Sequence, residues 1–406
     1  MTADVLNIYS AMTETPEEYK DIAPYDDAEF KSQMAQLISE PGFEHAIRYV
    51  MPDVDFNALR DSLMRLDNKE DFQKLVMMNI LLLLEKKTTA GVSDSGIENF
   101  NPDHASLFIT NHRDIVLDAS FLGLAMIRRG LQAQEIALGD NLLIYEWIEK
   151  LVRLNKGIIV KRNLRLTKAL EAARQLSGYI HHCIMQKNKS VWIAQREGRA
   201  KDSNDVTQDA VLKMLALAGE APDALHRLME LNIIPTSISY EYDPNDYLKA
   251  KEFLSRRRDP AFKKCQRDDL LSMETGILKY KGRVHFSIRR PVNQELESLV
   301  AITDKNEVIR KVCEIIDREI HLGYRIYPVN YIAFDAVNAT DRFAGEYSAA
   351  DVEEFNRYLD GQLDKVDLPD ITEEERAFMR RAILGMYANP LRNQLTAKGE
   401  AVKPES

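Results

Sequence analysis

Between residues 105 and 292, short apolar runs alternate with longer segments of helical periodicity. The runs have strand length and are rich in β-branched and aromatic side chains. They predict strands at residues 106–110, 134–138, 157–161, 190–195, 232–240 and 283–289. The segments between them predict helices at residues 118–129, 141–154, 164–187, 206–219 and 222–231. This alternation is typical of an α/β fold, here a mixed central sheet flanked by helices.

Helical patterns dominate on both sides of this region. Residues 26–88 have helical spacing with a break at Met51–Pro52, and a polar, glycine-containing linker follows at 89–104. After residue 293 the pattern predicts helices at 294–321, 350–362 and 372–387, with an extended segment at 324–334. We therefore predict a loose amino terminus (1–25), a helical region with its linker (26–104), an α/β domain (105–292) and a mostly helical carboxy-terminal extension (293–406).

The longest apolar run is Leu75–Leu84, LVMMNILLLL, with Asn79 inside it and lysines on both sides. A membrane span needs about 18 or more apolar residues, so this run is too short to cross a bilayer. It predicts a buried helix, or alternatively a helix that places one face in a bilayer surface. The first ten residues, MTADVLNIYS, lack the basic and apolar regions of a secretory signal.

Charge and cysteine content exclude some functions. The formal net charge of −10 over 406 residues argues against a nucleic-acid partner bound through a basic surface. Three widely separated cysteines favour a reducing compartment and give no metal-ligand spacing. One local run is basic, and it is either a solvated helical face or a dock for anionic headgroups or an acidic acyl carrier. Its residues are Lys249, Lys251, Arg256, Arg257, Arg258, Lys263 and Lys264.

Polar side chains follow three predicted strands. His112 follows the first of them, Lys161 and Arg162 end another, and Glu197, Gly198 and Arg199 follow a third. Ligands of open α/β sheets bind outside the carboxyl ends of strands. A histidine near several cations suits a base acting on a substrate that carries a phosphate, and Gly198 would let the backbone approach an anion closely.

These residue types fit acyl transfer to a hydroxyl. A hydroxyl needs a base at neutral pH, and a histidine oriented by a carboxylate provides one. Both Asp114 and Asp118 follow His112 closely enough to be that carboxylate. The chain has no G-x-S-x-G motif and no cysteine near His112, which favours direct transfer over a covalent acyl-enzyme.

Four motifs in this order resemble those of the glycerophospholipid acyltransferases, the family of glycerol-3-phosphate and lysophosphatidate (1-acylglycerol-3-phosphate) acyltransferases. They are Asn111-His112 with a following aspartate, Gly157–Arg162, Glu197–Arg199, and Ile234-Pro235 leading to Tyr240-Glu241. The resemblance covers residues 100 to 292. It departs from the family pattern twice: five residues, not four, separate His112 from Asp118, and Arg199 follows Gly198 directly rather than one residue later.

The resemblance implies roles for individual residues. His112 would be the general base, with Asp118 as its preferred partner because it opens the predicted helix. Asp114 stays an alternative partner, or else is solvated or salt-bridged to Arg113. Arg162, with Lys161, would hold the acceptor phosphate, on a strand expected to end beside that of His112. The remaining predicted site residues complete the phosphate pocket (Glu197, Gly198, Arg199) or shape the acyl or thioester side (Pro235).

The resemblance also implies substrates and location. Acyl-CoA or acyl-carrier protein would be the co-substrate, with no other cofactor, and the acceptor would be glycerol 3-phosphate or 1-acylglycerol 3-phosphate in phosphatidate synthesis. A cytoplasmic protein peripherally associated with the inner membrane face is expected. Three alternatives stay open: another acceptor such as a lyso-aminolipid, a metal-dependent hydrolase using His112, Asp114 and Asp118, and a non-catalytic lipid-binding protein. His181 and His182 are expected at the surface of their helix.

Overall fold

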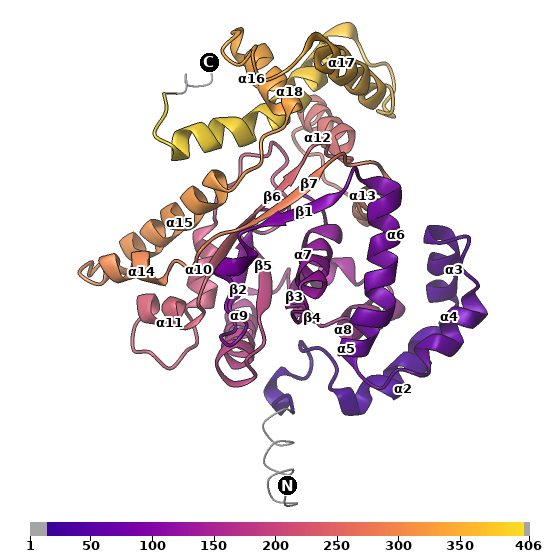
Figure 1. Ribbon diagram of the computed structural model, residues 1–406, viewed down its shortest axis with the longest axis vertical. Coiled ribbons are helices and arrows are strands. Elements are labelled where there is room, and N and C mark those ends of the chain that lie inside the picture. Colours follow the sequence, from indigo (N-terminus) through magenta and orange to yellow (C-terminus); the bar gives the residue numbers. More distant parts are fainter. Residues whose placement is uncertain (1–13, 402–406) are drawn as a thin grey trace, which may run out of the picture.

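A seven-stranded mixed sheet forms the centre of the protein, described here for residues 14–401 of a computed structural model (Figure 1). Its strands are β1 (Val92–Ser95), β2 (Leu107–Thr110), β3 (Glu135–Gly139), β4 (Gly157–Val160), β5 (Val191–Ala194), β6 (Ile234–Tyr240) and β7 (Val284–Ile288). The strand order is β1-β7-β6-β2-β5-β3-β4. Strands β2 to β6 run parallel, whereas β7 is antiparallel to β6 and carries β1 at its edge. The predicted mixed α/β fold is confirmed.

Helices cover both faces of the sheet because alternate residues of its strands point to opposite sides. On β2, Leu107 and Ile109 enter one core and Phe108 the other. The first core is closed by α9 (Leu166–His181), α10 (Asp209–Leu215), α11 (Ala224–Glu230) and α15 (Lys305–Leu322). The second is closed by α6 (Met78–Thr88) and α7 (Leu117–Arg128).

The amino-terminal helices form a layer with its own core beside the sheet (Figure 1). They are α2 (Asp27–Ile38), α3 (Pro41–Val50), α4 (Phe56–Leu63), α5 (Lys69–Asp71) and the π-helical turn η2 (Phe72–Met77). Phe30, Phe43 and Phe56 are buried there against Leu154 of α8 (Glu146–Leu154). Of the run Leu75–Leu84, Val76, Leu81 and Leu84 are buried while Leu75 is exposed. No helix within residues 14–401 is long and apolar enough to cross a bilayer.

The carboxy-terminal extension, residues 293–406, is helical in its described part, as predicted, and its last three helices pack on α12 (Asp246–Arg258) at one end of the molecule (Figure 1). These are α16 (Pro328–Asn338), α17 (Ala349–Leu363) and α18 (Glu373–Ala397), whereas α15 of the same extension packs on the sheet. Helix α13 (Gln266–Leu278) connects α12 to β7. The remaining short helices are η1 (Glu17–Tyr19), η3 (Ile97–Asn99), η4 (Asp140–Leu142), η5 (His182–Gln186), α14 (Asn293–Leu296) and η6 (Glu297–Leu299).

Two elements differ from their predicted type. The segment 89–104 is not only a linker, because it contains β1, whose residues alternate between exposed and half-buried at the sheet edge. Such a polar edge strand lacks the apolar pattern on which strand prediction depends. The predicted extended segment 324–334 contains the start of α16, where Pro328 occupies the first turn and the Asn330 side chain accepts from the Tyr327 amide. Proline at that position is compatible with a helix.

Near both ends of the described chain, buried side chains extend the ordered structure beyond what the sequence pattern predicts. The prediction of a loose segment at 1–25 is wrong from residue 14 on, because Ile22 and Ala23 are buried and the Ile22 carbonyl accepts from the Ile159 amide of β4. Residues 1–13 lie outside the described part. Helix α18 continues to Ala397 through Pro390, since Leu391 and Leu395 are buried in the carboxy-terminal core.

One histidine was expected at the surface but is buried. His181 Nε2 contacts the Leu215 carbonyl oxygen at 3.1 Å, and burial lowers the pKa of this imidazole. Its helix is covered by α10 at this point, a long-range contact that helical periodicity does not reveal.

Candidate active site

His112 and Asp118 form a hydrogen-bonded pair where β2 turns into α7. His112 Nδ1 lies 2.9 Å from Asp118 Oδ2, and the backbone amides of Arg113 and Asp114 donate to the same oxygen at 2.6 and 3.0 Å. The Asp118 side chain is 1% exposed and that of His112 14%. Because an ionised carboxylate has only acceptors, Nδ1 carries the hydrogen and Nε2 is left as the basic nitrogen. The turn between β2 and α7 accommodates the one residue by which the spacing of His112 and Asp118 exceeds the family pattern.

Asp114 has a different task. Its Oδ1 accepts from the amides of Val116 and Leu117 at 2.9 and 2.7 Å, which caps α7. It is neither solvated nor paired with Arg113, because it is buried and Arg113 makes a two-pronged ion pair with Asp205. Burial, followed by the neighbouring Asp118, raises the pKa of Asp114. No group of three or more His, Cys, Asp or Glu side chains in residues 14–401 is arranged to hold a metal ion.

Two further side chains hold the turn that carries His112. The Asn111 amide group pairs with the backbone of Ile238, donating to its oxygen at 2.9 Å and accepting from its nitrogen at 2.7 Å. This extends the contact between β2 and β6 by one residue. Trp192 of β5 lies edge-on to the His112 ring, with centroids 5.8 Å apart, and its Nε1 donates to Thr110 Oγ1 at 3.1 Å. The role of Trp192 was not predicted, because its place beside His112 depends on the pairing of β5 with β2.

Arg162 does not follow a strand adjacent to that of His112. Strands β5 and β3 separate β4 from β2, so the predicted adjacency is wrong. Arg162 instead reaches across the end of β3, where a Cβ atom on Gly139 would lie 2.4 Å from its Nε. Its guanidinium approaches Glu197 at 3.6 Å. The missing side chain at Gly139 therefore leaves the space through which Arg162 reaches the site.

A hollow of 450 Å³ opens in front of His112 at the carboxyl ends of the parallel strands. Five predicted site residues line it: His112, Arg162, Glu197, Gly198 and Arg199. Gly198 has φ +69°, and within residues 14–401 no atom beyond its two chain neighbours lies within 4 Å of the position of a Cβ atom there. Any other residue would be strained at this φ and would place a side chain in this open space.

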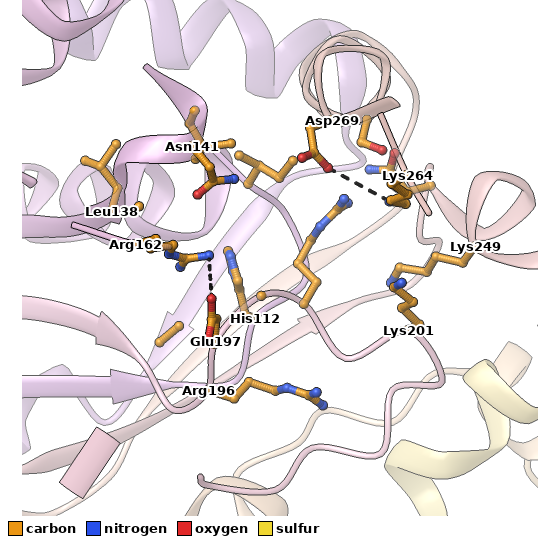
Figure 2. Close-up of a pocket in the computed structure, with 18 of the residues that line it drawn as sticks. His112, Leu138, Asn141, Arg162, Arg196, Glu197, Lys201, Lys249, Lys264 and Asp269 are labelled. Carbon is orange, nitrogen blue, oxygen red and sulfur yellow. Dashed lines mark ion pairs between the residues drawn. The ribbon is translucent and has the colours of Figure 1, made fainter. Parts of the chain in front are cut away.

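The opposite wall of this hollow comes from residues that carry no motif. Figure 2 shows His112 beside Arg162 and Glu197, with Lys201, Lys249 and Lys264 across the hollow. Lys249 is on α12, Lys264 precedes α13, and neither is merely part of the solvated helical face considered above. Asn245, before α12, is 1% exposed, and both polar atoms of its side chain lack a hydrogen-bond partner among the described residues.

This wall holds more positive than negative charge. Glu252 pairs with three cations, Lys201, Lys264 at 3.2 Å and Arg256 at 2.9 Å, and Lys264 also lies 4.0 Å from the carboxylate of Asp269. Burial, followed by repulsion from Arg199, lowers the pKa of Lys264. The Lys249 ammonium pairs with the carboxylate of Asp243 at 2.5 Å. An anion in the hollow would relieve this crowding of cations.

A second hollow of 350 Å³ adjoins the first, lies on the α9 and α10 side of the sheet and is largely apolar. The two share Ala137, Gly139, Arg162, Ala194, Arg196 and Glu197 as lining residues. Its apolar lining includes Leu164, Leu176, Ile193, Val211 and Met214.

Two predicted site residues lie away from the hollow at His112. Lys161 lines the second hollow, and its ammonium bonds to Asp21 and, at 3.1 Å, to Gln175. Pro235 lies within β6 opposite Ile109, and it is not among the described residues that line either hollow.

Comparisons with known proteins bear on this site. The family model described as Acyltransferase matches residues 91–239, which include the first three motif regions and the fourth up to Ser239. No curated protein matches the chain. Among solved structures, the 1-acyl-sn-glycerophosphate acyltransferase PlsC from Thermotoga maritima is similar, with 16% identity and a TM-score of 0.35 over 73% of this chain and 96% of that chain. That likeness is too low to transfer substrates or residue roles.

Proposed function

We propose, from the match of residues 91–239 to the family model described as Acyltransferase and from the four motifs, that the protein transfers a fatty acyl group from acyl-CoA or acyl-carrier protein to a hydroxyl of glycerol 3-phosphate or 1-acylglycerol 3-phosphate. The observation that carries the proposal is the His112–Asp118 pair at the edge of a hollow rich in cations.

In this proposal, His112 acts as a general base. Nε2 takes the proton of the acceptor hydroxyl while its oxygen attacks the thioester carbon. The tetrahedral intermediate then collapses, the carbon–sulfur bond breaks, and the thiolate takes the proton from Nε2. Asp118 holds the ring and stabilises the transient imidazolium, and its two backbone hydrogen bonds keep it in place.

The cations would position the acceptor through its phosphate. Arg162 and Arg199, which follow strand ends, and Lys201 with Lys264 on the opposite side give charge-assisted donors around the hollow. A phosphate held there would keep a hydroxyl only a few bonds away within reach of His112. The excess positive charge of this wall supports a phosphorylated rather than a neutral acceptor.

The second hollow would take an acyl chain. It joins the first across Gly139 and Ala194, where the absence of large side chains keeps the two connected. Its apolar lining under α9 and α10 is suited to burying methylene groups, each worth about 0.8 kcal/mol. Peripheral contact of the protein with a membrane follows from a lipid product, and we include it in the proposal.

Product analysis tests this function most directly. The purified protein would be incubated with acyl-CoA or acyl-carrier protein and with glycerol 3-phosphate, 1-acylglycerol 3-phosphate, monoacylglycerol or a lyso-aminolipid, and the products identified by mass spectrometry. We expect acylated products only with the phosphorylated acceptors, and none with His112→Ala. Acylation of the lyso-aminolipid or of monoacylglycerol alone would overturn the proposed acceptor, and free fatty acid as the only product would indicate a hydrolase.

A further inference from the structure

The first turns of α9 expose leucine side chains that do not join either core of the sheet. Leu166 is 91% exposed, more than any other large apolar side chain in residues 14–401, and Leu170 is 46% exposed. Residues four apart lie on the same face of a helix, so these two leucines form one apolar strip. Leu164, 37% exposed, continues the strip into the loop before the helix.

Cations surround this strip. Arg165 and Lys168 are exposed, and neither makes an ion pair with another described residue. Between residues 161 and 174 the chain carries five lysines and arginines and one carboxylate, Glu171, although its total charge is −10. Lys161 and Arg162 are paired with Asp21 and Glu197, so the positive charge beside the leucines comes from Arg165 and Lys168, which favours contact with an anionic surface.

The strip lies close to both hollows, so a surface that binds it would be near the site. Leu164 lines the apolar hollow proposed for an acyl chain, and Arg162, two residues earlier, lines the hollow at His112 as well. A surface that contacts Leu164, Leu166 and Leu170 would thus lie next to the entrance of both. A lipid could pass between that surface and the site without crossing water.

We propose that this α9 strip, defined as Leu164, Leu166 and Leu170 with Arg165 and Lys168, docks onto the surface of an anionic phospholipid bilayer. The leucines enter the boundary between headgroups and acyl chains, and the two cations lie among the lipid phosphates. Apolar side chains and basic residues on one short helical face are the combination that binds this interface. The inference extends the proposed function, since it says where a lipid acceptor reaches the enzyme.

Vesicle binding tests the strip without any measurement of activity. Cosedimentation would compare vesicles of phosphatidylcholine alone with vesicles containing equal amounts of phosphatidylcholine and phosphatidylglycerol. The variants are Leu166→Glu combined with Leu170→Glu, and Arg165→Ala combined with Lys168→Ala. The control is Leu75→Glu, a leucine that is 60% exposed on η2, in the apolar run for which a bilayer-facing helix was the alternative.

We expect the wild-type protein to bind the anionic vesicles, and more weakly as salt rises. The leucine variant should bind about tenfold more weakly or worse, the cation variant should lose the preference for anionic vesicles, and Leu75→Glu should bind as the wild type does. Unchanged binding by both α9 variants overturns the inference, as does loss of binding only in Leu75→Glu or no vesicle binding by the wild type.

A second readout separates this inference from the proposed function. With water-soluble glycerol 3-phosphate and a short-chain acyl-CoA, the leucine variant should turn over like the wild type. With 1-acylglycerol 3-phosphate presented in anionic vesicles, its rate should fall in parallel with its binding. If the wild type acylates neither acceptor, the proposed function fails, but the vesicle result still decides the docking surface. Equal rates of variant and wild type on vesicles contradict a role for the strip in delivering lipid.

Discussion

The two walls of the hollow at His112 differ in origin. One wall is made of strand ends and carries the motif residues His112, Arg162 and Glu197. The other is made of α12 and its surroundings and carries Asn245, Lys249 and Lys264, which belong to no motif. The strand wall contains a base with its partner in fixed geometry, whereas the helical wall contains positive charge that is only partly neutralised. In the proposed function, the strand wall therefore supplies the base and one phosphate-binding cation, Arg162, and the helical wall supplies further positive charge for binding the substrate.

The largest effect should come from the base on the strand wall. His112→Ala should lower kcat for acyl transfer by about 10²–10⁴-fold and leave KM nearly unchanged, because a general base acts in the transition state. Steady-state kinetics with glycerol 3-phosphate and acyl-CoA measure this. The matched change on the helical wall, Lys264→Ala, should mainly raise KM. A loss of kcat in Lys264→Ala as large as that in His112→Ala would remove the division between the walls.

The next effect separates the two carboxylates behind His112. Asp118→Asn keeps the shape but loses the charge that orients the imidazole, so kcat should fall by about 10²-fold or more. Asp114→Asn should change kcat little, since an amide oxygen can still accept from Val116 and Leu117 and burial already raises the pKa of this carboxyl. Both variants would be compared by kcat at one pH with circular dichroism as a folding control. The reverse order of effects would assign the partner role to Asp114.

A smaller and more selective effect is expected at the cation of the strand wall. Arg162→Lys keeps the charge but loses the forked guanidinium, so KM for glycerol 3-phosphate should rise about tenfold while KM for acyl-CoA stays constant. Arg165→Lys, three residues away and outside the hollow, should change neither constant. A rise only in KM for acyl-CoA would mean that Arg162 binds the donor's phosphates.

The last prediction concerns stability rather than catalysis, at the buried carboxylate of Asp246 that packs under the helical wall. Asp246, at the start of α12, accepts from Tyr358 and Tyr387 at 2.8 and 2.9 Å and from Gln362 at 2.5 Å. Burial and then Asp243 raise its pKa to about 7. The folded protein therefore holds a proton that the unfolded chain releases above its lower pKa, so this group makes stability fall as pH rises from 4 to 7.

Asp246→Asn should remove that dependence and raise the unfolding free energy at pH 8, because an amide carries no charge to bury. The increase should be on the order of 2 kcal/mol, since the three hydrogen bonds already offset part of the penalty of the buried charge. Urea unfolding at pH 5 and pH 8 measures it. Asp360→Asn, an exposed carboxylate of α17, is the control and should leave the pH dependence as it is. An unchanged difference between the two pH values in Asp246→Asn would show that Asp246 is not the group responsible.

The amino-acid sequence by itself determined the α/β alternation and the strand ends at which polar residues gather. These features are local, because side chains of a buried strand repeat in a short window and turn residues follow it directly. For that reason His112, Arg162 and Glu197–Arg199 could be found from sequence order and motif spacing. The polar edge strand β1 could not, because the apolar periodicity that identifies a strand is absent from it.

Only the tertiary structure decided which side chains lie next to His112 and Arg162. Strand order places β5 and β3 between β4 and β2, so Arg162 reaches the site across Gly139 rather than from a neighbouring strand. The turn after His112 selects Asp118 over Asp114, through backbone amides whose direction no spacing specifies. Lys264 enters the hollow from more than 150 residues further along the chain than His112. Such contacts depend on the packing of whole elements, and the free energy that fixes them comes from cores shared by distant segments.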